Sequence, residues 1–558
     1  MFDIANHPLS NLLTKTSTGR ESLAHGITRI EYPELFIGFV APIGTDVRAS
    51  INSFSSYFKA EGYNVVPIKV TEVFDKLAAY LPPKKKLVQS DEAGRLETYI
   101  KYGNQLRSTF DDDQVLAAIT ITRIVQWRLA RSAADKAAAP EKNVYLLYQF
   151  KRREEIDLLR SVYGRAFFQV SVYSRRGARV DNLSRRFAEG HNRGNTNTYR
   201  GAAEEIVQRD ENESDEQHGQ RVSRIFHDAD VIVNSDKGEE DVDRQVRRFC
   251  DLLFGSNRIS PNRNEYGMFA AKAAALRTLD LSRQVGVAIF SQNGEIISMG
   301  SNEVPKAGGG TYWCDDPEGH DDRDYQRGHD ANDKRKAQLL LELLELAKVR
   351  DAKKLVENKK IQDSQFMDAL EYGRIIHAEM SAICDAARLG RSVQDAILFT
   401  TTFPCHLCAK HVVAAGIKKV IFLEPYPKSL AANLHSDSIT IEGADRGKYS
   451  TFGGVSFEHF DGVSPRRYRE LFERSSRKNS GEFQDWIGGT KQPIVDLKFP
   501  FYLVLEKQII ESTTGSLAKI NMPVTALEQN AVRVTSAMRS TRGSGKRRPS
   551  KAKKGGVR

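Results

Sequence analysis

Three side chains that bind zinc well, together with one carboxylate, are closely spaced in the second half of the chain. His377 and Glu379 are two residues apart, and Cys405 and Cys408 follow in a Pro-Cys-x-x-Cys run. A zinc site with three protein ligands keeps its fourth position for water. Zinc lowers the pKa of that water toward neutrality, and a neighbouring carboxylate can carry its proton. The residues therefore predict a catalytic Zn²⁺ site with Glu379 as proton shuttle.

The pattern around these residues predicts the elements that must hold them. An amphipathic helix is expected over 377–389, ended by Gly390, and a strand over 394–402 leads into Pro404. A second helix is expected over 405–416. Both groups of ligands then lie at helix N-termini, where the helix dipole favours thiolate over thiol.

The alternatives for the same residues are a structural zinc site and a Cys-x-x-Cys pair that binds no metal. A structural site would need a fourth protein ligand, and His406 and His411 are the candidates nearby. Neither histidine explains why a glutamate stands two residues after His377, so the catalytic interpretation is preferred.

The spacing His-x-Glu followed by Pro-Cys-x-x-Cys is the signature of zinc nucleobase deaminases. Segments 396–405 and 415–422 closely resemble deoxycytidylate deaminases, as do 283–290 and the turn at 300–305. This resemblance covers about residues 260–460. It implies a three-layer α/β/α cytidine deaminase-like domain with Zn²⁺ as its cofactor, Glu379 as the catalytic residue and three metal ligands: His377, Cys405 and Cys408.

The same resemblance implies three contacts to the substrate. Asn302 would meet the sugar hydroxyl, backbone groups at Ala378 would meet the O2 edge of the pyrimidine, and Tyr426 would lie near the substrate. Asn302 as a cap of its own turn and Tyr426 as a core residue are the alternatives.

A second α/β domain is expected before the deaminase-like one. Apolar segments typical of buried strands occur at 34–41, 64–70, 144–148, 167–173 and 229–234, with helical patterns between them. This alternation predicts a doubly wound domain with a largely parallel sheet.

The first of these strands leads into a turn and a helix, which is the geometry of a phosphate-binding loop. The sequence departs from the Walker A pattern, because Thr45 stands where its lysine belongs and Asp46 where Ser or Thr would hold magnesium. We therefore expect a degenerate P-loop kinase-like domain that is architectural or senses a nucleotide. Its possible nucleotide-binding loop comprises Gly38, Pro42, Gly44 and Thr45.

Seven arginines lie where kinases of this shape keep a phosphate-clamping lid, and a solvated helical face is the alternative. They are Arg152, Arg153, Arg175, Arg176, Arg179, Arg185 and Arg186.

The degenerate P-loop domain contains the runs 157–164 and 209–213 and is joined to a deoxycytidylate deaminase-like domain. With these features the chain resembles the bacterial anti-phage dCTP deaminases over about residues 30–510. The resemblance implies deamination of dCTP and dCMP to dUTP and dUMP, which depletes cytosine deoxynucleotides during phage infection. It also implies deoxycytidine nucleotides as ligands and a small regulatory RNA as a possible partner. Deaminases of this kind are often hexameric, so a homo-oligomer is expected.

The expected boundaries divide the 558 residues into four parts. They are an N-terminal arm at 1–30, the P-loop kinase-like domain at 31–257, the deaminase domain at 258–512 with an insertion near 306–372, and a basic disordered tail at 513–558. Ten Lys or Arg and no acidic residue lie in 529–558, so of the net charge of +11 only 11 − 10 = +1 remains for the rest. Such a tail cannot bury a core and is attracted to polyanions.

The composition indicates in which cellular compartment the protein is located. No apolar run of about 18 residues is present to span a membrane, and five cysteines in this length make no disulfide framework. A cytoplasmic location is expected.

Two other classes of function stay open: a deaminase acting on bases in RNA or DNA, which the basic tail favours, and a non-catalytic nucleotide- or RNA-binding sensor. In the insertion, Cys314 with His320 or His329 offers too few ligands for a full second zinc site, and a leucine-rich helix at 337–347 suits either assembly or core packing.

Overall fold

Apolar strands of the first half pair into a six-stranded sheet in the order β12-β5-β4-β1-β3-β2. The computed structural model describes residues 29–134, 142–190, 195–213, 216–317, 319–362, 364–426, 428–442 and 446–527. Five strands of this sheet are parallel, as the sequence predicts: β1 (Leu35–Val40), β2 (Asn64–Lys69), β3 (Asn143–Tyr148), β4 (Phe167–Tyr173) and β5 (Val231–Asn234).

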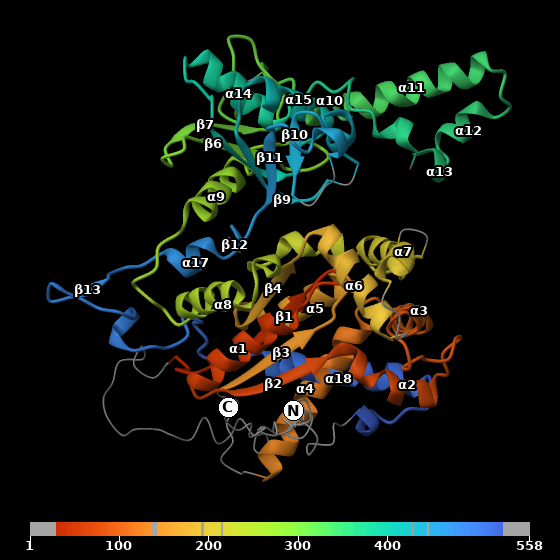
Figure 1. Cartoon of the computed structure of the whole chain (residues 1–558), viewed down its shortest axis with the longest axis vertical. Coiled ribbons are helices and arrows are strands. Elements are labelled where there is room, and N and C mark those ends of the chain that lie inside the picture. The colour runs from red at the N-terminus through yellow and green to blue at the C-terminus, as the bar shows by residue number, and fades with distance from the viewer. Residues whose placement is uncertain are drawn as a thin grey trace, which may run out of the picture.

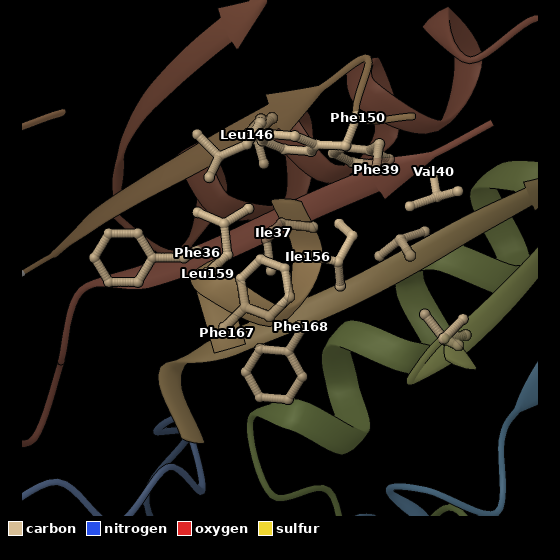
Figure 2. Packing of buried hydrophobic residues seen from close by; sticks show 14 of the residues in the cluster. Phe36, Ile37, Phe39, Val40, Leu146, Phe150, Ile156, Leu159, Phe167 and Phe168 are labelled. Carbon is tan, nitrogen blue, oxygen red and sulfur yellow. The ribbon is translucent and has the colours of Figure 1, made fainter. Parts of the chain in front are cut away.

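Helices cover both faces of this sheet because successive residues of its central strand point to opposite sides. Phe36 stacks on Tyr163 of α5 (Arg153–Tyr163) with ring centroids 3.6 Å apart, whereas Phe39 meets Phe54 of α1 (Arg48–Ala60). Figure 2 shows this core around β1 and β4. The remaining long helices of this body are α3 (Glu92–Phe110), α4 (Val115–Ala134), α6 (Arg176–Gly190), α7 (Arg200–Glu211) and α8 (Glu239–Leu253).

The second body is built on another six-stranded sheet, in the order β10-β11-β9-β8-β6-β7 (Figure 1). Its strands are β6 (Gly286–Phe290), β7 (Ile296–Ser301), β8 (Ile397–Thr402), β9 (Lys419–Glu424), β10 (Ile439–Ile441) and β11 (Val455–His459).

Alternate residues of β6 belong to different apolar clusters. Val287 and Ile289 pack with α14 (Ala378–Arg388) and α15 (His406–Ala414), whereas Ala288 and Phe290 join the cluster that contains Met268 of α9 (Arg263–Ala275). The sheet therefore lies between two helical layers, and the expected three-layer α/β/α arrangement is present.

The C-terminal part of the chain returns to the first body, which the expected boundary at 258–512 does not allow for. β12 (Gly462–Val463) pairs antiparallel with β5, and α18 (Tyr502–Ala518) packs on α4. A 3-10 turn, Val524–Leu527, follows α18, so ordered structure also continues past the expected start of the tail at 513. The strand and the helix fill an open sheet edge and an apolar helix face, neither of which is visible in local sequence. The predicted arm up to residue 28 and the tail from 528 lie outside the described residues.

A buried ion cluster ties α18 to the first body. Arg128 of α4 contacts Glu34 at 2.6 Å and Glu506 of α18 at 2.7 Å, and both glutamates are almost fully buried. Burial raises the pKa of Glu506. Three tyrosine hydroxyls donate to the two carboxylates: Tyr145, Tyr163 and Tyr502. The guanidinium of Arg128 therefore offsets most of the free-energy cost of burying the carboxylates of Glu34 and Glu506 away from solvent.

The two bodies meet where β4 ends. The ring of His459, in β11, stacks on Tyr173 with centroids 4.6 Å apart, and Lys237 pairs with Asp461 at 2.6 Å. Burial, reinforced by His227, lowers the pKa of His459 to about 4 against the opposing effect of Asp461. The junction therefore holds a neutral imidazole.

The inserted segment forms a helical arm that projects from the second body: α11 (Ala331–Leu346), α12 (Ala352–Val356) and α13 (Lys359–Gln362) (Figure 1). Leu343 and Leu346 of α11 are exposed, so core packing within this chain does not account for them. In the part of the chain that the structure describes, no helix combines the length and the apolar character needed to cross a membrane.

Candidate active site

The two predicted helices bring the candidate metal ligands together. His377 is the N-cap of α14 and Cys405 is the N-cap of α15, where its sulfur accepts the N–H of Cys408. Both helices begin within one residue of the predicted position, and β8 starts three residues later than expected. The sulfurs therefore lie in the first turn of a helix, where the dipole stabilises thiolate.

The distances fit a tetrahedral zinc ion. The Nδ1 atom of His377 lies 3.3 Å from the sulfur of Cys405 and 3.3 Å from that of Cys408. All three ligand atoms lie within 4.8 Å of one another. Zn–N and Zn–S bonds of about 2.0 and 2.3 Å at tetrahedral angles require N···S separations of about 3.5 Å. One imidazole and two thiolates are also a donor set that suits zinc.

The pKa shifts of the two cysteines also favour a zinc site. A hydrogen bond from Cys408, together with His377, lowers the pKa of Cys405 to about 4. The pKa of Cys408 is raised, because that hydrogen bond and burial both favour its thiol. Thiolate is the form that binds zinc, so metal binding at this pair of sulfurs would release the remaining proton.

Glu379 lies in the first turn of α14 with its side chain buried, 4% exposed. Burial raises the pKa of its carboxyl group, and the negative charge of Cys405 adds to the effect. A carboxyl group whose pKa is raised in a cleft can both accept and donate a proton, which general acid–base catalysis requires.

A cavity of about 360 Å³ opens over this group. His377, Glu379 and Cys405 line it together with all three predicted substrate contacts, Asn302, Ala378 and Tyr426. Ala378 is the first residue of α14, so its N–H has no acceptor within the helix. A ligand in the cavity could use that N–H.

The amide of Asn302 is already occupied. Its Nδ2 donates to Asp280 and to the carbonyl oxygen of Arg283, and its Oδ1 accepts the N–H of Val285. Asn302 therefore fixes its own turn at the cavity wall, as the alternative interpretation of this residue held. The Oδ1 atom accepts one hydrogen bond and has a second lone pair, so a sugar hydroxyl could donate to it without displacing Val285.

Tyr426 lies at the wall under a cation. The guanidinium of Arg283 lies 5.0 Å from the ring centroid and pairs with Glu424 at 3.1 Å. Burial raises the pKa of Tyr426. Tyr426 therefore lines the cavity, and its contact with a substrate stays a prediction.

The insertion also contributes to the cavity, which sequence reasoning missed. Lys336 of α11 is buried at the wall and donates to the carbonyl of Met367, while Lys428 pairs with Asp368 at 2.6 Å. Lys428 could have been suspected from its place two residues after Tyr426, but no local signal marks Lys336.

The described residues contain one group of three or more potential metal ligands, His377 with Cys405 and Cys408. His406 and His411 do not join it, so the fourth ligand of a structural site is missing there. Cys314 and the histidines after it form no second group in the same part of the chain.

The possible nucleotide-binding loop differs from the expectation. Gly38 lies within β1, where an added Cβ would be 2.7 Å from the ring of Phe167, so it serves packing. Gly44 has φ +87° and lies against the backbone of Arg179. The N–H of Ile43 donates to the carboxylate of Asp210 at 2.7 Å. An internal anion therefore occupies an amide that a phosphate would use.

Six of the seven predicted lid arginines form ion pairs with acidic residues of the same domain, and among the described residues Arg185 has no such partner. These pairs favour the structural alternative for most of the set.

Comparison with known proteins finds similarity in the second body. Residues 261–424 match the family described as the cytidine and deoxycytidylate deaminase zinc-binding region. Zinc is therefore the cofactor of this domain, and the His377, Cys405 and Cys408 cluster is the group that can bind it.

Individual relatives cover parts of the chain. A deoxycytidylate deaminase of Enterobacteria phage T4 is 46% identical over 54 residues, which are 10% of this chain and 28% of that protein. The deoxycytidylate deaminase of Homo sapiens is 26% identical over 159 residues, 28% of this chain and 63% of the human protein. The chain thus spans less than two thirds of the length of each. A dCMP deaminase structure from the cyanophage S-TIM5, in complex with dCMP and dUMP, is 18% identical with a TM-score of 0.21 over 36% of this chain and 99% of that one.

Proposed function

We propose that the chain is a zinc-dependent hydrolase that deaminates free cytosine deoxynucleotides. The observation that carries the proposal is the buried carboxyl group of Glu379 beside a three-ligand cluster at one cavity wall. Three ligands leave one zinc position for a reactant, and the carboxyl group supplies the proton transfers.

Zinc, when held by His377, Cys405 and Cys408, supplies a Lewis acid that activates water for attack on C4 of cytosine. Glu379 accepts a proton from that water, passes it to N3 and delivers a proton to the departing amine. The balance is one water consumed and one ammonia released as cytosine becomes uracil. In this proposal the N–H of Ala378, which has no acceptor within α14, orients the O2 edge of the base.

The names of the relatives support a deoxycytidine nucleotide as substrate. The finer proposal is that dCTP is taken as well as dCMP and that the depletion of both serves anti-phage defence in the cytoplasm. It rests on the resemblance of residues 30–510 to bacterial anti-phage dCTP deaminases. A regulatory RNA and a homo-oligomer belong to the same proposal, and the exposed leucines of α11 are a surface that suits assembly.

A P-loop kinase-like ancestry of the first body is also proposed. The parallel order β2-β3-β1-β4-β5 and the glycine turn after β1 support it. Asp46, which pairs with Arg48, and Asp210 at the loop amide argue against phosphoryl transfer.

The test is chromatography of dC, dCMP, dCTP, CTP and single-stranded DNA after incubation with the full chain. Conversion of dCMP or dCTP alone supports the proposal. Conversion of the DNA instead would favour the nucleic-acid deaminase, which remains the second candidate because of the basic residues at 529–558. No conversion by a zinc-loaded protein would favour the sensor.

Two variants connect turnover with the site. We expect Glu379→Gln to keep its zinc and lose about 10²- to 10⁴-fold in kcat, because it removes the proton transfers alone. Cys405→Ala should lose zinc and turnover together. The matched controls are Glu371→Gln and Cys384→Ala, two exposed residues of the same region. Zinc and activity retained by Cys405→Ala would refute the ligand assignment.

A further inference from the structure

A second cavity, of about 700 Å³, lies in the first body, away from the zinc cluster. Lys69 is the last residue of β2, Tyr148 is the last of β3, and Ala41 follows β1, so the cavity lies at the carboxyl ends of three parallel strands. Residues of α3 and α6, which lie side by side, form its walls (Figure 1). In open parallel sheets this edge is where ligands bind.

The wall of this cavity is strongly basic. Seven Lys or Arg line it against two acidic residues, Asp46 and Glu189. Five of the cations have carboxylate partners within 4 Å, and among the described residues the other two, Lys69 and Arg185, have none. The seven are Arg48, Lys69, Arg95, Arg107, Lys151, Arg185 and Arg186.

Lys69 is the more informative of the two unpaired cations. Its side chain is half-buried, and burial together with the nearby Arg95 lowers its pKa. The carboxylates of Glu72 and Glu92 raise the pKa of Lys69, but burial outweighs them, so an anion in the cavity would stabilise the half-buried ammonium group further.

Two residues of the cavity lining carry polar side-chain atoms without hydrogen-bond partners among the described residues. The Oγ1 atom of Thr45 and the Oε1 atom of Gln220 are buried and lack hydrogen bonds within the described structure, and Gln220 is only 7% exposed. Gln149, at the same wall, has φ +80°. Unsatisfied polar atoms and strained backbone are costly, and they concentrate at ligand sites.

The loop after β1 is not where the anion would sit, because Asp210 already accepts the N–H of Ile43. The free positive charge lies instead at the end of β2 and on α6, next to Tyr99 and Tyr148. We propose that this cavity binds a small phosphorylated molecule whose phosphate groups contact Lys69 and Arg185. Its volume is in the range of sites for drug-sized ligands and is far larger than a single phosphate ion needs.

Calorimetric titration of the full chain tests this site independently of deamination. The probes are inorganic phosphate, inorganic tripolyphosphate and ATP, none of which contains cytosine. We expect tripolyphosphate or ATP to bind, and Lys69→Gln and Arg185→Gln each to weaken binding at least about tenfold, the loss of one charge-assisted contact. ATP binding more tightly than tripolyphosphate identifies a nucleotide site, and the reverse order identifies a site for the phosphate chain alone.

The matched control is Lys59→Gln, an exposed lysine at the end of α1 outside the cavity, which should leave binding unchanged. A second readout is amine acylation followed by mass spectrometry, in which the ligand should protect Lys69 but not Lys59. Binding of no probe, or affinities unchanged in both Lys69→Gln and Arg185→Gln, would overturn the proposal while leaving the deaminase proposal untouched.

Discussion

Substitution of Gly300 tests whether the contact between strand and helix backbones sets the position of the catalytic carboxyl group. Gly300 lies in β7 under α14, the helix that carries Glu379 and is capped by His377. A Cβ at Gly300 would lie 2.3 Å from the carbonyl oxygen of Ala378 and 2.5 Å from the nitrogen of Ala382. Strand and helix backbones are therefore in direct contact where the helix begins, and Gly300→Ala must separate them.

The size of the displacement follows from these distances. Ordinary contacts of a Cβ begin near 3.4 Å, so α14 has to retreat by 3.4 − 2.3 = 1.1 Å from Gly300. A misplacement of about 1 Å at a catalytic group costs about 10²-fold in rate. Overpacking adds about 1–3 kcal/mol of destabilisation. We expect Gly300→Ala to lower kcat/KM on dCMP about 100-fold while the protein stays folded.

The assay measures kcat/KM and zinc content together with urea unfolding. The control is Gly201→Ala in α7, where an added Cβ meets nothing within 4 Å. That variant should keep full activity and gain up to about 1 kcal/mol from helix propensity. Wild-type kcat/KM in Gly300→Ala would show that α14 does not set the position of the carboxyl group, and the reasoning from backbone contact would fail.

Three further perturbations have defined outcomes. Arg128→Leu leaves two buried carboxylates without their cation and should lower the free energy of unfolding by about 3–5 kcal/mol in urea titrations. Burial already raises the pKa of Glu506, so protonation of this group should make the loss smaller at pH 5 than at pH 8, and an equal loss at both would contradict the assignment. His459 has a folded pKa of about 4, below its usual 6.5. Its contribution to the free energy of unfolding is therefore complete above pH 6.5 and decreases by up to about 3 kcal/mol as the pH falls toward 4. His459→Phe should remove that part of the pH dependence of unfolding. A chain ending at residue 527 should deaminate dCMP at the wild-type rate. Activity of the full chain on single-stranded DNA that this shorter chain loses would favour a polynucleotide substrate.

Local chemistry made the zinc cluster predictable. His377 and Cys405 each cap a helix, and Cys408 lies in the first turn of the second helix. Neighbouring residues indicate where both helices start, and the strand between them has a clear apolar pattern. The role of Asn302 was less accessible, because its partners, among them Asp280, come from another segment. Lys336 reaches the cavity only through the fold of the insertion, which has no periodic signature that specifies its position.

The domain boundary was also not predictable from local sequence, because it depends on contacts between distant segments. The chain leaves the first body after α8, builds the second sheet and returns with β12 and α18. The returning helix supplies Glu506 to Arg128 and Tyr502 to Glu34, so the first body lacks part of its core until the deaminase-like body has been crossed. Residues 31–257 alone would expose the β5 edge and leave Arg128 without one of its two carboxylates. The deaminase-like body is thus inserted into the sequence of the first body. After β11 the chain returns to the first body, where His459 stacks on Tyr173 at the end of β4.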